Sequence, residues 1–142
     1  MKRYMSLDIG DRTVGIAVSD LLGLTAQGVE TIRRGELDAD LNRLDELIAQ
    51  YEVDELVSGY PKNMNGTEGE RCQIVKDFMA EVSKRHPDLP VHFWDERLST
   101  VAATRSLIEA DVSRKKRKKV IDRMAAVRIL QYYLDAQKQK GA

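Results

Sequence analysis

The stretch that decides the fold is residues 4–20, YMSLDIGDRTVGIAVSD. Two short apolar runs, at 4–10 and 13–20, are rich in Val, Ile and Leu, and a Gly-Asp-Arg sequence lies between them. Apolar runs of this length with turn residues between them predict a β-hairpin. Asp8 lies inside the first run, where an ionised carboxylate is costly to bury without a partner. This stretch therefore predicts a β-hairpin and also contains a candidate functional residue, Asp8.

Outward from this hairpin, strand patterns alternate with helix patterns. We expect further strands at 25–34, 56–60 and 90–95, and helices at about 41–51, 67–82, 99–108 and 120–136. Asp38 and Asp40 can cap the first helix, and Thr67 has capping-box spacing with Glu70. Loops are expected over 61–66 and over the basic residues before the last helix. This order predicts an α/β protein with a mixed sheet, helices on both faces, and a single domain over 1–142.

The composition excludes several classes of protein. One cysteine rules out an internal disulfide, and with only two histidines the chain lacks a Cys- or His-rich zinc site. No apolar run approaches the length of a membrane span, and the first three residues lead into a strand pattern instead of a signal peptide. We therefore expect a cytoplasmic protein that does not associate with membranes.

The charges are equal in number but unevenly distributed. The chain has 23 basic and 23 acidic residues, yet residues 113–128 hold eight bases and one acid, and residues 36–55 hold eight acids and one base. A six-residue basic run is typical of a surface that attracts phosphates. A solvated, mobile loop explains the run equally well from sequence alone.

Carboxylates occur at positions where a purely structural role is unusual. Asp8 lies within a strand pattern, Asp95 and Glu96 end another, and Asp122 lies on a helix stripe beside Ala125 and Ala126. Because side chains alternate along a strand, Asp95 and Glu96 point to opposite faces and only one of them is expected in a shared site.

Each acid also has a plain structural explanation. Asp8 could bind backbone amides of the turn that follows it, and Asp122 could stabilise the start of its helix. Three acids on neighbouring elements, without histidines or thiolates, nevertheless suit a hard cation such as Mg²⁺ or Mn²⁺. Such a site can activate water for phosphodiester hydrolysis.

Four segments in order carry a family resemblance that covers residues 2–136. They are LDIG at 7–10 with GIAVSD at 15–20, GYPKNMNGT at 59–67, DERLST at 95–100, and Ile121-Asp122 followed by Ala125-Ala126. Together they resemble the YqgF (RuvX) family of pre-16S rRNA nucleases and Holliday junction resolvases. The resemblance implies an RNase H-like fold with a mixed five-stranded sheet. It also implies that Asp8, Glu96 and Asp122 are the catalytic, metal-binding acids, with Asp95 or Glu96 left open as the ligand.

One position departs from the related RuvC-type resolvases. Those enzymes carry a fourth acid three residues after the acid of the last helix, where this chain has Ala125. The resemblance therefore favours a metal-dependent nuclease that processes pre-16S rRNA in ribosome biogenesis. Holliday junction cleavage in DNA recombination and repair is the alternative. Symmetric cleavage of two strands would favour a dimer, and a monomer or a weak dimer both fit the sequence.

Polar and basic residues near these acids are candidates for binding nucleic acid, structured RNA or a DNA junction. Loop residues before a helix can bind a phosphate or a sugar, although asparagine and glycine also simply satisfy turn geometry. The candidates are Lys62, Asn63, Asn65, Thr67, Arg97, Arg114, Lys115, Lys116, Arg117, Lys118 and Lys119.

Two further classes of function compete with a nuclease. The hairpin resembles the phosphate-binding hairpin of actin-like nucleotide-binding proteins, but those need two such domains around a cleft. A non-catalytic RNA-binding factor of ribosome assembly would bind RNA in a salt-dependent way without cutting it.

Overall fold

The chain folds around a five-stranded mixed sheet, as its sequence predicts. The computed structural model describes residues 2–98 and 114–141, and in the last helix it describes side chains over 125–138 only. The strand order is β3-β2-β1-β4-β5. Strands β1, β4 and β5 are parallel, so their carboxyl ends lie at one edge of the sheet. The strands are β1 (Tyr4–Ile9), β2 (Thr13–Ser19), β3 (Ala26–Arg33), β4 (Glu55–Tyr60) and β5 (Val91–Asp95).

The hairpin at residues 4–20 forms the centre of this sheet. β1 and β2 are antiparallel, and the Gly10 amide donates to the Thr13 carbonyl at 2.9 Å to close the turn. β3 continues the antiparallel side as an edge strand, with a register shift between Ile16 and Ala17. The predictions of the hairpin and of a third strand after it are confirmed.

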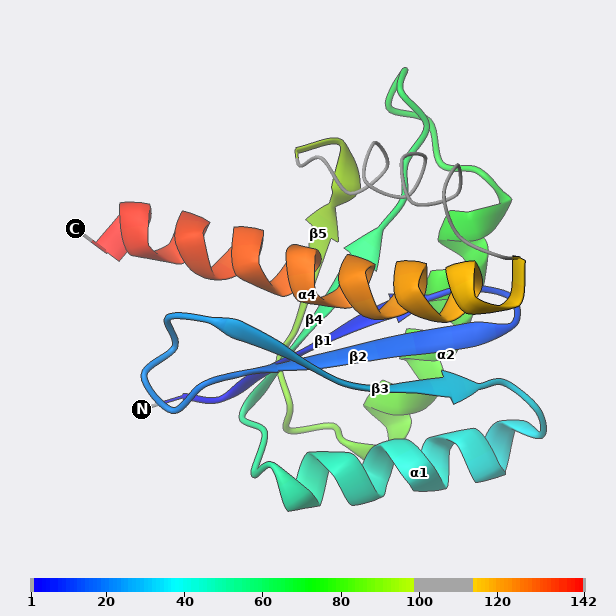
Figure 1. Cartoon of the computed structure of the whole chain (residues 1–142), viewed down its shortest axis with the longest axis horizontal. Helices are drawn as coiled ribbons and strands as arrows, with labels where there is room; N and C mark the ends of the chain where they lie inside the picture. The colour runs from blue at the N-terminus through cyan, green and yellow to red at the C-terminus, as the bar shows by residue number, and fades with distance from the viewer. Residues whose placement is uncertain (1, 99–113, 142) are drawn as a thin grey trace.

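Helices cover both faces of the sheet (Figure 1). Helices α1 (Leu37–Gln50) and α2 (Glu70–Arg85) pack on one face over a core that includes Leu7, Leu56 and Phe78. Helix α4 (Arg114–Gly141) crosses the other face, where Ala126 and Ile129 are fully buried. A short 3₁₀ turn, η1 (Glu96–Leu98), follows β5 directly. The sheet therefore separates two surfaces, one under α4 and one under α2.

The structure corrects three expectations about helix ends. Glu36, not Asp38 or Asp40, is the N-cap of α1, because its side chain accepts from the Asp38 amide. Gly69 is the N-cap of α2 and makes no side-chain cap hydrogen bond, so the predicted capping box is wrong. The basic residues 114–119 belong to the first turns of α4 and not to a loop. The helix expected at 99–108 lies outside the described residues.

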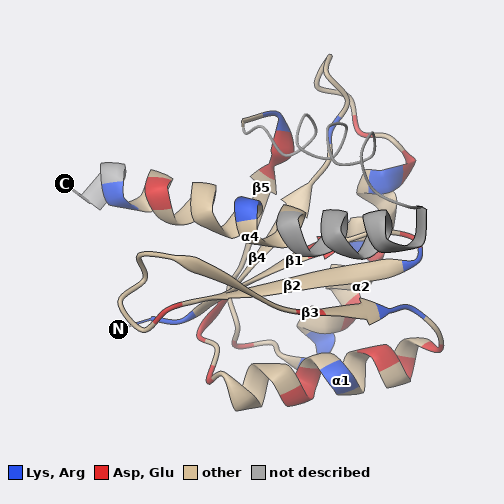
Figure 2. Ribbon diagram, viewed as in Figure 1, with Lys and Arg blue, Asp and Glu red and all other residues tan. Residues whose placement is uncertain are grey.

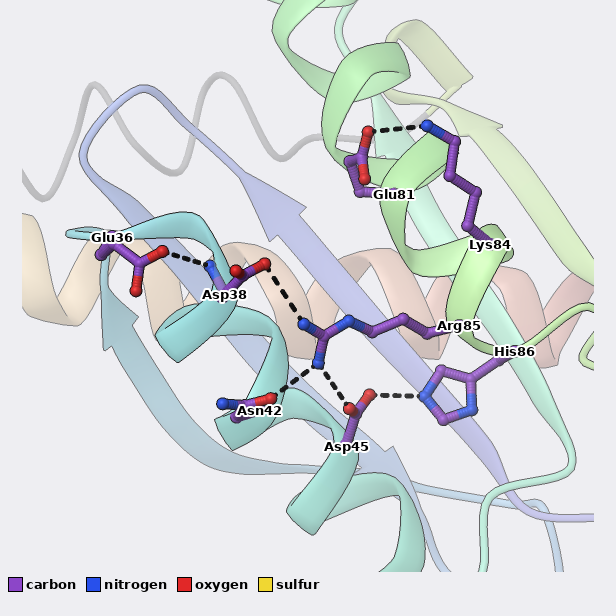
Figure 3. Close-up of polar contacts among 8 residues, drawn as sticks. All are labelled: Glu36, Asp38, Asn42, Asp45, Glu81, Lys84, Arg85 and His86. Atoms are coloured by element: carbon purple, nitrogen blue, oxygen red, sulfur yellow. Dashed lines mark hydrogen bonds and ion pairs between the residues drawn. The ribbon is translucent and has the colours of Figure 1, made fainter.

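An ionic clamp joins α1 to α2 on the face away from α4 (Figure 3). Arg85 Nη1 donates to Asp45 Oδ2 and to Asn42 Oδ1, each at 2.8 Å. His86 Nε2 lies 2.6 Å from the other oxygen of Asp45. We call Asn42, Asp45, Arg85 and His86 the helix clamp.

The charge asymmetry of the sequence is carried by helices on opposite faces. Acidic residues are concentrated on α1 and at its two ends (Figure 2). The six-residue basic run lies in α4, across the sheet. In the described part of the chain, no helix is both long enough and apolar enough to cross a membrane.

Candidate active site

Asp8 faces the sheet surface that α4 covers. Its neighbours Leu7 and Ile9 belong to the core on the other face, so alternation turns Asp8 towards α4. Ser6, two residues earlier and on the same face, donates a hydrogen bond of 2.6 Å to the Ala126 carbonyl of α4. The Asp8 side chain is only 3% exposed. A buried carboxylate in the central strand therefore lies under the last helix.

Glu96 reaches the same face from the turn after β5. It is 8% exposed, and its Oε2 lies 3.3 Å from the point that a Cβ on Gly59 would occupy. The same point is 2.6 Å from Cδ1 of Ile129 in α4. Because Gly59 has no side chain, the carboxylate of Glu96 fits between β4 and α4.

Asp8 and Glu96 are brought together by the pairing of β1 with β4. Leu7 pairs with Ser58 in parallel register, and Asp8 and Gly59 are the next residues along these adjacent strands. Neighbouring strands lie about 4.8 Å apart. The Glu96 carboxylate rests over Gly59, so two buried acids from different elements lie above neighbouring strands at the carboxyl edge.

Asp95 lies on the opposite face, as strand alternation predicts. It lines a pocket with Tyr60 and Phe93 on the α2 side of the sheet. Its carboxylate accepts from Arg97 Nε at 3.1 Å and from Arg97 Nη2 at 2.7 Å. These hydrogen bonds from Arg97 lower the pKa of the Asp95 carboxyl. Asp95 is therefore ion-paired with Arg97, and it lies on the opposite face of the sheet from Asp8.

The third acid of the predicted set lies in α4. Asp122 is inside this helix, one turn before the buried Ala125 and Ala126 that pack on the sheet. Its side chain, like those of the basic residues 114–119, lies outside the described part of the structure. The structure thus places Asp8 and Glu96 together, and it places the Asp122 backbone on the helix that covers them.

The donor chemistry of these acids fits a hard divalent cation. Carboxylate oxygens from separate elements are the ligands that Mg²⁺ and Mn²⁺ prefer. Within the described side chains, no group of three His, Cys, Asp or Glu residues forms a metal cluster. A three-carboxylate set therefore requires Asp122 in addition to Asp8 and Glu96.

The loop after β4 is stabilised by hydrogen bonds among the polar side chains of residues 63–67. Asn63 Nδ2 donates to Thr67 Oγ1, and this hydroxyl donates to Asn65 Oδ1 at 2.6 Å. Gly66 has φ of +87°, a conformation that favours glycine. Asn63, Asn65 and Gly66 thus satisfy the geometry of a turn, which is one of the two explanations that the sequence offers for them. Their expected contact with a phosphate stays a prediction.

This end of the sheet also contains functional candidates outside the predicted set, on both of its faces. Gly59 admits the Glu96 carboxylate, and Phe93, Glu68 and Lys76 line the pocket beside Asp95. Gly59 matters because Ile129 packs against it, and Ile129 is 70 positions away. Local sequence patterns therefore could not predict that this glycine is needed. Phe93 could have been found as an aromatic residue two positions before the strand-end acid.

Solved structures show the class of this fold. RuvC of Thermus thermophilus, in complex with a Holliday junction substrate, matches with a TM-score of 0.61 over 98% of this chain and 97% of that chain, at 12% identity. The fowlpox virus resolvase, in complex with Holliday junction DNA, matches with a TM-score of 0.55 over 95% of this chain and 98% of that chain, at 8% identity. The chain has the RNase H-like fold of RuvC-like resolvases.

Sequence comparison then gives the family. The family model for RuvX, described as a Holliday junction resolvase, matches residues 2–136, and the chain belongs to this family. A relative from Heliobacterium modesticaldum is 55% identical over 140 residues, covering 99% of this chain and 93% of that protein. A relative from Clostridioides difficile is 59% identical over 133 residues, covering 94% of each chain. Both relatives are named "Putative pre-16S rRNA nuclease".

Proposed function

We propose that this protein is a metal-dependent nuclease that hydrolyses phosphodiester bonds in pre-16S rRNA. The observation that carries the proposal is the pair of buried carboxylates, Asp8 and Glu96, under the helix that contains Asp122. Carboxylates that several separate elements bring close together form the donor set that a hard divalent cation prefers. The family and the names of its relatives supply the substrate class.

In this proposal the three acids hold Mg²⁺ or Mn²⁺, and the surrounding chain positions the substrate. When bound, such an ion activates a water molecule and stabilises charge on the phosphodiester. Asp8 and Glu96 are held in place by the sheet and by Gly59, which keeps their geometry fixed before substrate binds. The basic run of α4 attracts the RNA backbone, and Lys62 and Arg97 contact phosphates near the cut.

Holliday junction cleavage is the second candidate, supported by the description of the family. The side chain at 125 is a buried alanine, where RuvC-type enzymes carry a fourth acid. A three-acid site holds a second ion less well, so we expect RNA to be the better substrate. The protein is expected to act in the cytoplasm, where pre-rRNA is processed.

The test compares two labelled substrates, a precursor 16S rRNA fragment and a four-way DNA junction. Each is incubated with Mg²⁺, with Mn²⁺ or with chelator. We expect metal-dependent cleavage of the RNA that Asp8→Asn, Glu96→Gln and Asp122→Asn each reduce by at least about 100-fold. Binding of the RNA by these variants should survive.

A matched control distinguishes loss of the site from loss of stability. Glu55 is a buried glutamate at the amino end of β4, 7% exposed and far from the carboxyl edge. Glu55→Gln should keep the cleavage activity. Cleavage of the junction alone would support a resolvase instead. Binding of both substrates without cleavage would contradict the nuclease proposal and favour a non-catalytic RNA-binding factor.

A further inference from the structure

A small pocket opens on the α2 face of the sheet, beside the strand end that carries Glu96 to the other face. Its volume is about 300 Å³. This size is at the lower end of the range for ligand pockets, which is room for one nucleoside but not for a duplex. We call it the β5 pocket, and its lining residues are Tyr60, Lys62, Glu68, Lys76, Phe93 and Asp95.

The β5 pocket has an aromatic wall that is open to solvent. Phe93 is 50% exposed although it lies in a strand, and it packs edge-to-face on Tyr60 with ring centroids 5.4 Å apart. The Tyr60 hydroxyl donates a hydrogen bond to Glu68, which fixes the ring behind Phe93. An exposed aromatic face that is held rigid from behind is the platform on which unpaired bases stack.

Two of the cations around the pocket are each paired with a carboxylate. Lys76 forms an ion pair with Glu68 at 2.6 Å, and Arg97 forms one with Asp95 at 2.7 Å. Lys62 Nζ lies 6.0 Å from the centroid of the Tyr60 ring. Lys62 forms no ion pair with a described carboxylate, but its positive charge acts on Glu68 and Asp95 and contributes to the lowered pKa of each. The pocket thus combines an aromatic face with a cation that can bind a phosphate.

The position of the pocket relates it to the two buried acids. Asp95 lines the pocket, and Glu96, the next residue, lies over Gly59 on the face of Asp8. Consecutive Cα atoms are about 3.8 Å apart. The pocket and the acids thus lie on opposite faces of the sheet but at the same end of β5, where a nucleic-acid strand that passes around this end can reach both.

We propose that the β5 pocket binds one unpaired nucleotide beside the scissile bond, with its base on Phe93 and its phosphate on Lys62. This inference rests on the proposed nuclease function and adds to it a preference for one kind of RNA substrate. The enzyme should cut RNA where a nucleotide next to the scissile bond is unpaired. A nucleotide held in a duplex cannot enter the pocket without leaving its stack.

The first test measures binding without any cleavage. AMP is titrated into the isotope-labelled protein, and the backbone amide signals of Phe93 and Lys76 are followed by NMR. Adenosine and inorganic phosphate serve as separate arms that distinguish the base from the phosphate. We expect AMP to shift both signals, adenosine to bind more weakly, and phosphate alone to leave Phe93 unchanged.

Variants of the aromatic wall make this test specific. Phe93→Ala should weaken AMP binding at least about fivefold, because base stacking on an aromatic side chain is lost. Phe93→Tyr should restore it. Leu22→Ala removes a 63% exposed apolar side chain from the distant β2–β3 turn and should have no effect. AMP shifts that are absent, or that persist unchanged in Phe93→Ala, would overturn the inference.

The second test uses two RNA hairpins that differ only in whether the nucleotide beside the cut is paired. The wild-type protein should prefer the unpaired substrate, and Phe93→Ala should lose most of this preference. Cleavage of RNA without AMP binding at Phe93 would contradict nucleotide binding in the β5 pocket but would still support the nuclease function. AMP binding at Phe93 without cleavage of any RNA would support the pocket and contradict the nuclease function.

Discussion

At the scale of single residues, Gly59 determines whether the two acids can share a site. A Cβ at this position would lie 2.6 Å from Ile129 Cδ1 and 3.3 Å from Glu96 Oε2. The helix or the carboxylate would have to move to accommodate it. Gly59 therefore contributes to the site by lacking a side chain.

Gly59→Ala is expected to lower both stability and activity. Overpacking of this kind costs about 1–3 kcal/mol of the free energy of unfolding, and displacement of Glu96 should reduce cleavage further. The control is Gly35→Ala, because a Cβ on Gly35 meets no atom within 4 Å. Urea unfolding and RNA cleavage are measured for both variants, and equal behaviour of the two would contradict this role of Gly59.

Residue patterns predicted the acids but not their surroundings. Alternation along β5 was enough to place Asp95 and Glu96 on opposite faces. It could not show which face α4 covers, because that depends on contacts such as Ser6 with Ala126. The choice of Glu96 as the acid beside Asp8 therefore needed the packing of a helix whose residues are remote in sequence.

At the scale of elements, the helix clamp fixes α1 against α2. Asp45→Ala should lower the free energy of unfolding by about 1 kcal/mol, since its hydrogen bonds to Arg85 and His86 are only partly shielded from solvent. Glu81→Ala breaks the exposed pair with Lys84 on the same helix (Figure 3) and should cost less than about 0.5 kcal/mol. Urea denaturation distinguishes the two, and equal losses would show that the clamp is unimportant.

The strands β4 and β5 are linked at their amino ends by Glu55. Burial alone would raise the pKa of the Glu55 carboxyl, but hydrogen bonds from His92 and Lys2 outweigh burial and lower it. His92 Nε2 is 2.7 Å from Glu55 Oε1, and Lys2 Nζ is 2.9 Å from Oε2. The charged form of Glu55 is therefore favoured in the folded protein.

This lowered pKa predicts how stability depends on pH. Glu55 stabilises the fold above the pKa that it has when unfolded, and the contribution is lost as the pH falls through its lower folded value. Glu55→Gln should be less stable than the wild type at pH 7, with the difference shrinking as the pH falls below 4.5, the ordinary pKa of a glutamate. Unfolding curves that stay parallel across this range would contradict the prediction.

The elements themselves were largely predictable, and each error has its own physical cause. Apolar periodicity gave all five strands and the first two helices. The charge of the basic run predicts a loop, but Lys and Arg are good helix formers, and the run begins α4. Likewise the capping box failed because Thr67 is bonded to Asn65 inside its own loop.

At the scale of the whole molecule, the separation of charge predicts strong salt dependence of RNA binding. Each phosphate contact on a single strand contributes about −0.7 to the slope of log affinity against log salt. Replacing all six residues of the run 114–119 by Gln keeps helix propensity and should make the slope shallower by up to about four. Lys84→Gln, on the α1–α2 side, should leave it unchanged. An unaltered slope in the sixfold variant would exclude the run from RNA binding.

The hydrogen bond from Ser6 to Ala126 has a consequence for how the protein is made. It joins positions 120 residues apart, and α4 is the only described helix on its face of the sheet. During translation the hairpin emerges before α4, so the face of β1 that carries Ser6 and Asp8 stays uncovered until α4 has also left the ribosome. An apolar surface that waits this long for its covering helix is exposed to aggregation in the meantime.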